Sequence, residues 1–585
     1  MKPQRLLFNY IRSNWYLYAI AVSFTMTGNV IQSFYPKVIG DFTDQLELGD
    51  ITRTAIVDYS LLLLAVGLSF GLLAGMGQYM IMRLGRRFEF YTRNRLFVHF
   101  MTLSENYYSK HGVGKWLSYV INDVTAVRES ISAGINQTAN ATMLIISAVF
   151  MMLINDIPYY LIIACVLPLL VIPWIVTRFG PIIRGRSMKV QESLGKMTES
   201  AEEQFGGIRV TKKFAVEPIM IDRFGQTVDN IRDNQLHLVR VSSLFQALIP
   251  FLGALSFIVT ILYGGYLTIH NTISLGNFVA LTLYIRMMVN PLQQIGNVIN
   301  TMQRSRASLT RINDLLSVES EIQDSLEAKP ADLSHAGVAI RHLSYTYPGA
   351  SKETLHDIDL TVEPGKTLGI IGKTGSGKTT LMKLLLRVYD SPEGTILFDD
   401  RDIHELTIES LRSQIAYVPQ DGFLFSTTIR DNIAFFRRES GFEHVEKAAR
   451  QAQIYDSIAA FPEQFETKLG ERGITLSGGQ RQRTSLARGI IKNAPLLIMD
   501  DSVSAVDAVT ETSIVNSIRK ERKSKTTILI AHRISAIKHA DEIVVLNEGR
   551  IVQRGTHKDL LKQQGLYAEL YTIQEEGSRH VDHVR

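Results

Sequence analysis

A stretch in the second half of the chain has the residue types and the spacing of a phosphate-binding loop. It consists of Gly372, Lys373, Thr374, Gly375, Ser376, Gly377, Lys378, Thr379 and Thr380. The stretch fits the pattern G-x-x-x-x-G-K-[ST], in which glycines let successive backbone N–H groups point inward at nucleotide phosphates. We expect Lys378 to reach the β- and γ-phosphates and the Thr379 hydroxyl to ligate Mg²⁺. A glycine turn with a stray lysine is the alternative.

Polar residues further along the chain fit the same chemistry. Asp500 ends a buried-strand pattern, the usual setting for an aspartate that holds Mg²⁺, and Asp501 stands where a general base for the attacking water is expected. Gln420 ends another strand pattern and could ligate Mg²⁺ or position water. His532 follows a third apolar strand and could contact a γ-phosphate. Each residue alone is unspecific, whereas their order and spacing after the loop are specific.

Two more stretches belong with these residues. Tyr345 and Tyr347 precede the loop at a distance along the chain that lets one of their rings stack on a nucleotide base, and Tyr347, which a turn pattern follows, is favoured. An aromatic residue before a turn is, however, commonly part of a core. A helical pattern opens with Ser477, Gly478, Gly479 and Gln480, and its N-terminal amides suit a phosphate. Because one loop already cradles a phosphate, this second helix start indicates a nucleotide held by a different domain.

The elements expected around these residues are those of an α/β domain. An apolar run at 368–371 predicts a buried strand before the loop, and a helical pattern at 381–386 follows it. Strand, glycine loop and helix form the context that the phosphate-binding pattern requires. Further strands are predicted at 415–420, 496–500 and 527–531. The domain is expected to begin near residue 338, after a polar linker.

The first half of the chain is built differently. A helix needs about 20 mostly apolar residues to cross a hydrocarbon core of about 30 Å. Six stretches qualify, at 15–40, 58–84, 130–154, 159–179, 241–269 and 276–299. Polar residues such as Asn29, Gln32 and Asn136 within them indicate helices packed around a polar cavity. Arg286 lies near the middle of the sixth stretch, where a cavity-lining role is the default hypothesis and a salt bridge inside the bundle is the alternative.

The distribution of basic residues predicts the orientation in the membrane. The short connections at 154–159 and 269–276 contain neither Lys nor Arg, whereas the two long connections are basic. The positive-inside rule therefore places both termini and both long connections in the cytoplasm. We expect the helices to extend beyond the bilayer, with a short transverse helix near each of two glycine-bearing breaks, at 110–114 and 205–208. A plain cytoplasmic loop is the alternative.

Composition narrows the classes of function. A chain of 585 residues is expected to form more than one domain. Its net charge of +5 is small for this length and does not suggest nucleic-acid binding. The single cysteine, Cys165, excludes an intrachain disulfide, and there is no cluster of Cys and His spaced like a metal site. The first apolar stretch is too long for a signal peptide, so we expect an uncleaved membrane helix.

Together these motifs resemble those of the ATP-binding cassette (ABC) exporters, in particular the half-transporters that fuse six membrane helices to one nucleotide-binding domain. The resemblance covers almost the whole chain. It identifies Tyr347 as the A-loop, 372–379 as Walker A, Gln420 as the Q-loop, 467–473 as a further matching stretch, 476–480 as the signature, Asp500 as the end of Walker B, 504–507 as the D-loop and His532 as the switch histidine.

The resemblance also implies a fold, cofactors and an assembly. The fold is an α-helical polytopic membrane domain, 1–319, with six transmembrane helices and long cytoplasmic extensions. A linker, 320–337, joins it to an α/β P-loop nucleotide-binding domain, 338–585. The cofactors are ATP and Mg²⁺. Two such domains enclose two ATP, each between the Walker motifs of one domain and the signature of the other, and 107–115 and 205–213 lie near the coupling helices.

One departure from the family pattern concerns catalysis. The glutamate that follows Walker B in the family is Asp501 here, and its side chain is one methylene shorter. A base must come within about 2.6–3.2 Å of the proton that it takes, and a misplacement of about 1 Å can cost about a hundredfold in rate. We therefore expect this site to hydrolyse ATP poorly, while the intact signature completes a competent site on a partner that carries Glu.

This asymmetry resembles that of heterodimeric bacterial multidrug exporters, and a homodimer that tolerates Asp501 is the alternative. The expected function is a subunit of a plasma-membrane pump that moves amphipathic compounds outward. Its expected partners are a second half-transporter, the lipid bilayer and the transported compound, with no nucleic acid. A lipid flippase or peptide exporter of the same architecture competes with this reading. So does a membrane regulator that is gated by ATP and transports nothing.

Overall fold

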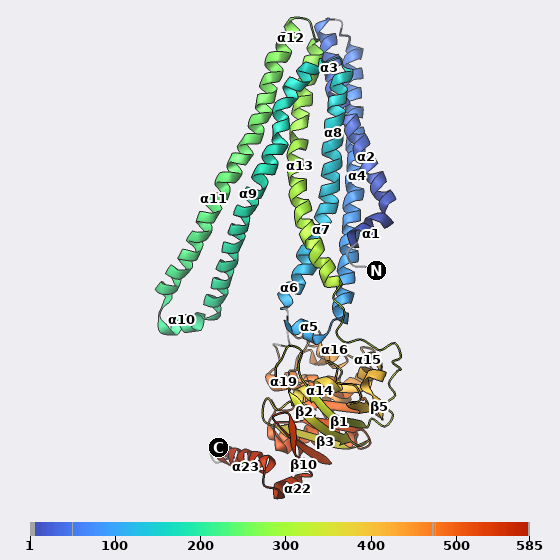
Figure 1. The fold of residues 1–585 in the computed structure, drawn as a ribbon, viewed down its shortest axis with the longest axis vertical. Helices are drawn as coiled ribbons and strands as arrows, with labels where there is room; N and C mark the ends of the chain where they lie inside the picture. Colours follow the sequence, from blue (N-terminus) through green and yellow to red (C-terminus); the bar gives the residue numbers. More distant parts are fainter. Residues whose placement is uncertain (1–5, 50, 111, 471–472, 474, 583–585) are drawn as a thin grey trace. The chain divides into compact units, whose positions relative to one another are not determined.

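The computed structural model describes residues 6–49, 51–110, 112–470, 473 and 475–582. The chain divides into two units, Met1–Leu103 with His111–Glu319, and Ser104–Lys110 with Ser320–Arg585. The first unit is helical and the second contains the sheets (Figure 1). The predicted fold class, a helical region followed by an α/β domain, is confirmed. Segment 320–337 groups with the second unit and adds Ala331 and Leu333 to its core.

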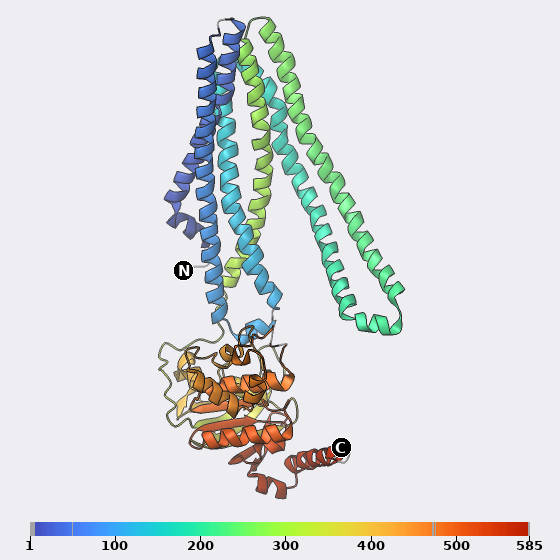
Figure 2. The ribbon, with the colours of Figure 1, turned by 180° about the vertical axis from the view of Figure 1, so that it is seen from behind.

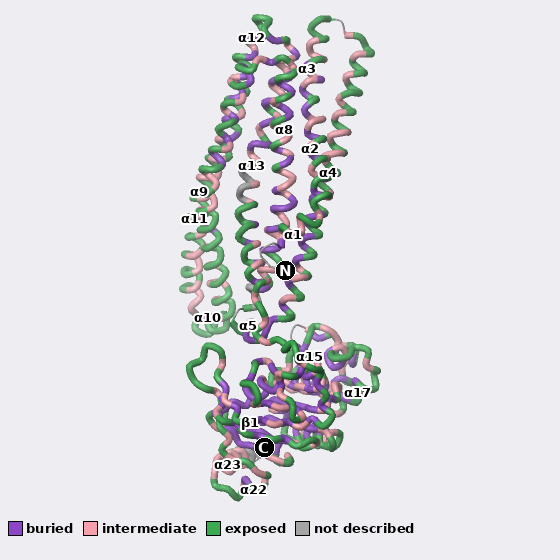
Figure 3. Tube along the Cα trace, turned by 45° about the vertical axis from the view of Figure 1, so that its right-hand side comes forward, coloured by how far each residue is buried: buried purple, intermediate pink, exposed green. Residues whose placement is uncertain are grey.

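The first unit consists of long helices and short helical segments. They are α1 Leu6–Ser13, α2 Trp15–Gln32, α3 Phe34–Glu47, α4 Arg53–Thr102, α6 Val113–Ser118, α7 Val124–Glu129, α8 Ile135–Ile154, α9 Tyr159–Gly206, α10 Ile208–Phe214, α11 Glu217–Val259, α12 Gly265–Ile269 and α13 Leu275–Leu316. Short π-helical segments continue α6 into α7 and α8, and α11 into α12. Figure 3 shows buried residues along α8 and α13. An apolar cluster joins these helices to α9 and includes Cys165 of α9 and Leu281 and Tyr284 of α13.

Four helical stretches of the described residues are long and apolar enough to cross a membrane. They are Arg53–Thr102, Trp116–Ile154, Tyr159–Gly206 and Glu217–Ile269. They contain the second to the fifth predicted spans. The first and sixth predicted spans are helical, in α2–α3 and α13, but are not among these four. The count of six spans therefore stays a prediction.

Several helices are longer than a bilayer requires. α4 has 50 residues and α9 has 48, which correspond to about 70–75 Å at 1.5 Å per residue. A short helix lies near each predicted break: α10 follows Gly207, and α5 (Glu105–Lys110) precedes Gly112. α10 runs across between the ends of α9 and α11 in both views (Figures 1 and 2). The expected short helices are thus present at both positions.

The contact between α3 and α13 depends on glycine. A Cβ atom on Gly276 would lie 2.5 Å from Cγ of Asp44 and closer still to the carbonyl oxygen of Gly40. Asp44 accepts hydrogen bonds from the backbone N–H of Gly276 (2.5 Å) and from the Ser274 hydroxyl (2.8 Å). One carboxylate of α3 thereby satisfies one of the orphan N-terminal N–H donors of α13 and holds its N-cap, Ser274.

The second unit contains two sheets. Their strands are β1 Val338–Tyr345, β2 Leu355–Val362, β3 Thr367–Gly372, β4 Ile396–Phe398, β5 Arg401–Asp402, β6 Ile415–Val418, β7 Leu496–Asp500, β8 Thr526–Ile530, β9 Glu542–Asn547 and β10 Arg550–Gly555. The smaller sheet has the order β2-β1-β4-β5 and the larger one β10-β9-β3-β8-β7-β6. From β9 to β6 the larger sheet is parallel. The predicted strands at 368–371, 415–420, 496–500 and 527–531 correspond to β3, β6, β7 and β8.

Helices cover this parallel sheet. Those of the second unit are α5 Glu105–Lys110, α14 Lys378–Leu385, α15 Ile408–Ser413, α16 Ile429–Ile433, α17 Phe442–Gln451, α18 Tyr455–Ala459, α19 Gly478–Ile491, α20 Ala508–Glu521, α21 Ile534–Ile537, α22 His557–Lys562 and α23 Leu566–Asp582. Every residue of β7 is buried, and its side chains alternate between two apolar clusters, Leu497 and Met499 in one and Leu496 and Ile498 in the other. Burial on both faces explains the uninterrupted apolar run that predicted this strand.

Candidate nucleotide-binding site

The phosphate-binding loop lies between β3, which ends at Gly372, and α14, which begins at Lys378. Gly375 and Gly377 have φ values of 82° and 98°, a region that residues with a Cβ atom rarely adopt. A Cβ atom on Gly377 would also lie 2.6 Å from Cδ2 of Leu355. The predicted strand, loop and helix are present. Gly375 and Gly377 are required in the loop because a side chain would strain the backbone at both positions and would clash with Leu355 at Gly377.

Lys378 is buried beneath this loop, with 7% of its surface exposed. Its ammonium donates hydrogen bonds to the carbonyl oxygens of Gly372 and Lys373, both at 2.9 Å. Burial lowers the pKa of Lys378, and the nearby carboxylates of Asp500 and Asp501 partly oppose that shift. A buried ammonium whose hydrogen-bond acceptors are mainly neutral carbonyls is suited to an anion such as a polyphosphate.

Asp500 ends β7 beside the loop and is 3% exposed. Burial raises the pKa of Asp500, and hydrogen bonds from Thr379 and Tyr417 act in the opposite direction. The Tyr417 hydroxyl lies 3.5 Å from Oδ2 of Asp500. A carboxylate and a threonine hydroxyl that meet at the end of a phosphate loop are the hard oxygen ligands that Mg²⁺ prefers. The residues present therefore fit the predicted metal ion.

Asp501 brings together the other predicted catalytic residues. It has a φ of 46°, which is unusual for a non-glycine residue, and it is 5% exposed. Its Oδ2 accepts a hydrogen bond from Nε2 of Gln420, and its Oδ1 accepts one from the backbone N–H of His532, both at 3.3 Å. The ends of β6, β7 and β8 thus converge on one carboxylate.

Tyr347 lies on another side of the loop. Its hydroxyl is 3.0 Å from Oγ1 of Thr380. Its ring packs edge-on against Tyr345, at 5.3 Å between centroids, and against Tyr389, at 5.1 Å. The residue is only partly buried, which leaves part of the side chain exposed, as stacking on a base requires.

The signature stretch forms a separate site. Ser477 is the N-cap of α19, where its hydroxyl accepts from the Gln480 backbone N–H (3.3 Å) and the Gln480 side chain accepts from the Ser477 N–H (2.9 Å). Ser477 and Gly478 are exposed. Within the part of the chain that the structure describes, no hydrogen bond of this turn reaches the loop at 372–380. In the matching stretch at 467–473, Glu471 and Arg472 lie outside the described residues.

The segment from His532 to Ser535, called the switch loop below, is held by contacts that the sequence did not predict. Gln574 of α23 donates from Nε2 to the carbonyl oxygen of His532 (2.8 Å) and accepts at Oε1 from the N–H of Ile534 (2.9 Å). Glu511 of α20 is 1% exposed and accepts from Arg533 (3.1 Å) and from the Ser535 hydroxyl. Glu511 begins an apolar helical stripe completed by Ile514, Val515 and Ile518. A lone acid on such a stripe is a signal that could have identified it.

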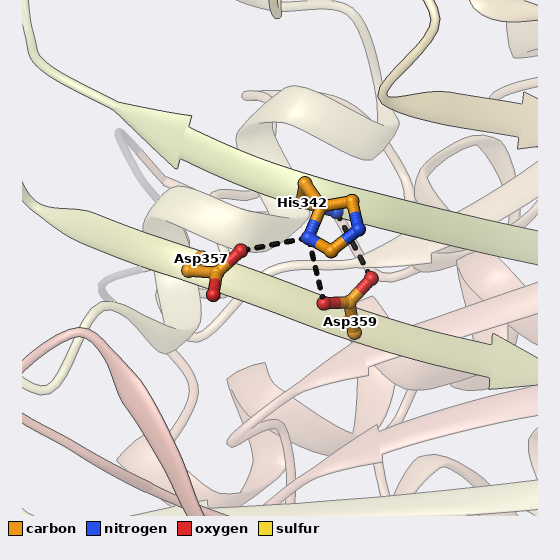
Figure 4. Close-up of side chains that lie close together, drawn as sticks. All are labelled: His342, Asp357 and Asp359. Carbon is orange, nitrogen blue, oxygen red and sulfur yellow. Dashed lines mark hydrogen bonds and ion pairs between the residues drawn. The ribbon is translucent and has the colours of Figure 1, made fainter.

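A group of potential metal ligands was also not foreseen. His342 of β1 lies between Asp357 and Asp359 of β2 (Figure 4). The His342 Nδ1 atom is 2.9 Å from Asp357 and 3.2 Å from Asp359, and the His342 backbone N–H donates to Asp359 (3.0 Å). Hydrogen bonding to Asp357 is the largest cause that raises the pKa of His342. Nδ1 of His342 is therefore already engaged by both carboxylates, which explains the group as an exposed ion-pair network.

A parallel sheet with a phosphate loop, two consecutive carboxylates at the end of β7 and an attached set of membrane-length helices defines a membrane protein driven by a nucleoside triphosphate. Residues 18–292 match the family model for the ABC transporter transmembrane region, and residues 355–504 match that for the ABC transporter. The chain belongs to the ABC transporter family. It is an exporter that binds ATP with Mg²⁺ and couples ATP hydrolysis to transport across a membrane.

Relatives extend this assignment over the whole chain. The probable multidrug resistance ABC transporter ATP-binding/permease protein YheI of Bacillus subtilis is 35% identical, over 97% of this chain and 96% of that protein. The ATP-dependent lipid A-core flippase of Thiobacillus denitrificans is 32% identical, over 97% of each chain. The structure of a bacterial Atm1-family ABC exporter with ATP bound superimposes with a TM-score of 0.78 at 26% identity, over 96% of this chain and 98% of that one.

Proposed function

We propose that this chain is one subunit of a heterodimeric exporter that moves amphipathic compounds out of the cell. Its own Walker site binds ATP and hydrolyses it weakly, while its signature completes the competent site of a partner that carries Glu after Walker B. The membrane domain is 1–319, the linker 320–337 and the cassette 338–585. The protein lies in the plasma membrane with both termini in the cytoplasm.

The observation that carries this proposal is the setting of Asp501. Both oxygens of its carboxylate already accept hydrogen bonds from the same chain, from Gln420 and from the His532 backbone. The short side chain is therefore held back against its own strand ends, and a glutamate would carry the carboxylate one methylene further toward a water molecule. Since a base must reach its proton within about 3.2 Å, this site is built for nucleotide retention more than for turnover.

The remaining residues have roles that fit ATP. The Tyr347 ring stacks on the base, and Lys378 with the backbone N–H groups of the loop neutralises the β- and γ-phosphates. Thr379, Gln420 and Asp500 hold Mg²⁺, which supplies further neutralisation of the phosphates when bound. His532 faces the γ-phosphate. The amides from Ser477 to Gln480 cover a nucleotide that is bound by the partner, and closure of the two cassettes shifts the membrane helices toward an outward-facing state.

The names of the relatives support an amphipathic substrate, since they include a multidrug transporter and lipid A-core flippases. A lipid-flipping function is therefore the second candidate. Ligand-stimulated ATPase measurements with cationic drugs, lipids and peptides separate these classes, because only a transported compound is expected to accelerate turnover. Vesicle transport that is lost when the partner's Walker A lysine is replaced by alanine would exclude a non-transporting regulator.

The heterodimer is tested by co-purification and paired substitutions. The tagged chain is expected to bring down an untagged ABC half-transporter from its native membrane. In the complex, Asp501→Asn is expected to leave steady-state ATPase within about twofold, whereas Glu→Gln after the partner's Walker B removes it by about a hundredfold or more. A purified single chain that hydrolyses ATP as fast as the complex, and loses this rate with Asp501→Asn, would contradict the proposal and indicate a homodimer.

A further inference from the structure

A cavity of about 400 Å³ lies in the first unit, between α2, α3, α4 and α13. This volume is within the range of pockets that hold small molecules. Most of its wall is apolar, with Val66 and Phe70 from α4 and Met287 from α13. The polar groups are the amide of Gln32, the hydroxyl of Tyr35 and the guanidinium of Arg286.

Arg286 is the only charged residue among the described lining residues of this cavity. No carboxylate lines the cavity, and no described residue forms an ion pair with Arg286. The alternative of a salt bridge inside the bundle therefore has no partner among the described residues. Arg286 lies ten positions after Gly276, hence about 15 Å along the helix, and within the match to the transmembrane family model, 18–292.

A cation without a counter-ion at this depth is costly, because the surrounding medium solvates it poorly. The side chain is exposed to the cavity in the single chain, so its compensation must come from water, from the proposed partner subunit or from a molecule that enters. An uncharged compound would displace water and leave the guanidinium unpaired, and a cationic compound would be repelled. An anionic group would be paired, and its bidentate geometry suits guanidinium.

We propose that this cavity selects amphipathic anions, with the carboxylate, sulfonate or phosphate headgroup on Arg286. Gln32 and Tyr35 donate further hydrogen bonds to that headgroup. The apolar tail lies along Val66, Phe70 and Met287. The inference rests on the proposed exporter function, because it names the class of compound that the pump takes up. The anion has two sources, a free amphipathic compound or the headgroup of a bilayer lipid.

The test is a binding measurement on the full chain with its partner, without nucleotide, in phosphatidylcholine nanodiscs. The probes are the fluorescent fatty acid 11-(dansylamino)undecanoic acid and its uncharged methyl ester, each corrected with empty nanodiscs. The acid is expected to bind at least about tenfold more tightly than the ester, the size of one hydrogen-bonded charge pair. Arg286→Gln is expected to reduce the affinity for the acid to that for the ester, and Arg286→Lys is expected to retain most of the preference for the acid.

Two controls keep the measurement decisive. Arg304→Gln removes an exposed arginine of the same helix that does not line the cavity, and it is expected to bind both probes as the wild type does. Ester binding by Arg286→Gln at wild-type affinity reports an intact cavity. Competition by phosphatidylglycerol in the nanodisc identifies the bilayer as the source of the anion, and its absence identifies free compounds.

The proposal is overturned if the wild type binds acid and ester equally, or if Arg286→Gln keeps the preference for the acid. These results are distinguishable from a failure of the exporter function. A complex that binds the acid through Arg286 but moves no compound into inverted vesicles contradicts the proposed export function and supports the anion site. A complex that exports only cationic or uncharged compounds contradicts the site and leaves export.

Discussion

At the scale of single residues, burial of charge is the property that marks the nucleotide site. Lys378 and Asp500 are each more than nine-tenths buried, and burial shifts the pKa of each toward the neutral form. Such groups cost stability in the empty protein and gain it when a ligand of opposite charge arrives. The site is therefore a place where binding and folding stability are linked.

Lys378→Met tests this linkage. The folded pKa of Lys378 is lowered below its ordinary value of 10.5. Between the folded and the unfolded pKa of Lys378, the unfolded chain therefore binds more protons than the folded chain. The destabilisation that buried Lys378 causes is complete at neutral pH, and it decreases as the pH rises from the folded to the unfolded pKa. We expect the nucleotide-free variant to melt at a higher temperature than the wild type at pH 7.5, by a margin that shrinks toward pH 10. The variant should also lose the stabilisation by Mg-ATP, as measured by thermal unfolding.

Glu511→Ala should destabilise the cassette strongly. It would leave the Arg533 and Ser535 donors without their buried carboxylate, and breaking such a buried network costs about 3 kcal/mol. Denaturant unfolding of the cassette signal measures this loss, with Thr512→Ala, an exposed neighbour, as the control. An effect below that of Thr512→Ala would show that the switch loop does not depend on Glu511.

At the scale of elements, the close packing of α3 against α13 requires a residue without a side chain at Gly276. Gly276→Ala would force a Cβ atom against Asp44 and the backbone of α3, which costs roughly 1–3 kcal/mol by overpacking. Gly265→Ala is the matched control, because nothing lies within 4 Å of a Cβ atom there. We expect the first variant alone to lower the melting temperature of the purified protein. Equal melting of the two variants would contradict the close contact.

Within the second unit, α5 contacts the cassette through polar side chains. The Lys383 ammonium lies 2.7 Å from Glu105, and Asn106 donates to Glu321 at 2.8 Å. Because both partners of the ion pair are partly exposed, a double-mutant cycle of Glu105→Gln and Lys383→Gln should give a coupling energy below about 1 kcal/mol. Stimulation of the ATPase activity by a transported compound, measured in the same variants, reports their function. A coupling energy of several kcal/mol would indicate a pair that is buried during turnover.

Elements were more predictable from sequence than the contacts between them. The apolar runs of β3, β6, β7 and β8 were recognisable because each is buried on both faces, and the carboxyl ends of parallel strands meet at one edge. The convergence of Gln420, Asp501 and His532 follows from that rule. The bonds of Gln574 could not be predicted, since they depend on where α23 docks, more than forty residues along the chain. The pairing of His342 with Asp357 and Asp359 depends equally on the register of β1 and β2.

At the scale of the whole molecule, the exposed signature explains why we expect a partner. Ser477 and Gly478 present a capped helix start to solvent. The loop at 372–380 makes its contacts elsewhere, with Tyr347 and Asp500. This exposed surface suits phosphate, and the described part of this chain does not use it, so it is the feature on which the proposed partner rests.

Ser477→Arg tests that arrangement. The substitution would place a bulky cation over the helix start and is expected to reduce ATPase of the complex at least about tenfold, by disturbing donors at the partner's phosphates. Labelling of this chain by an azido-ATP analogue should continue, because its own loop is untouched. Lost labelling of this chain with normal ATPase would reverse the assignment. Ser513→Arg, at an exposed position of α20, controls for a new surface charge.

The hold of Gln574 on the His532 loop has a practical consequence for anyone handling the protein. The loop at His532 is anchored by Gln574 of α23, so a chain trimmed after α22 would lose that anchor without losing any of the motifs named above. Such a shortened protein would also lose the buried Tyr567 ring from the apolar core of the second unit, so α23 contributes to the stability of this unit as well as to the position of the His532 loop. Shortened variants of this chain should therefore keep α23 intact.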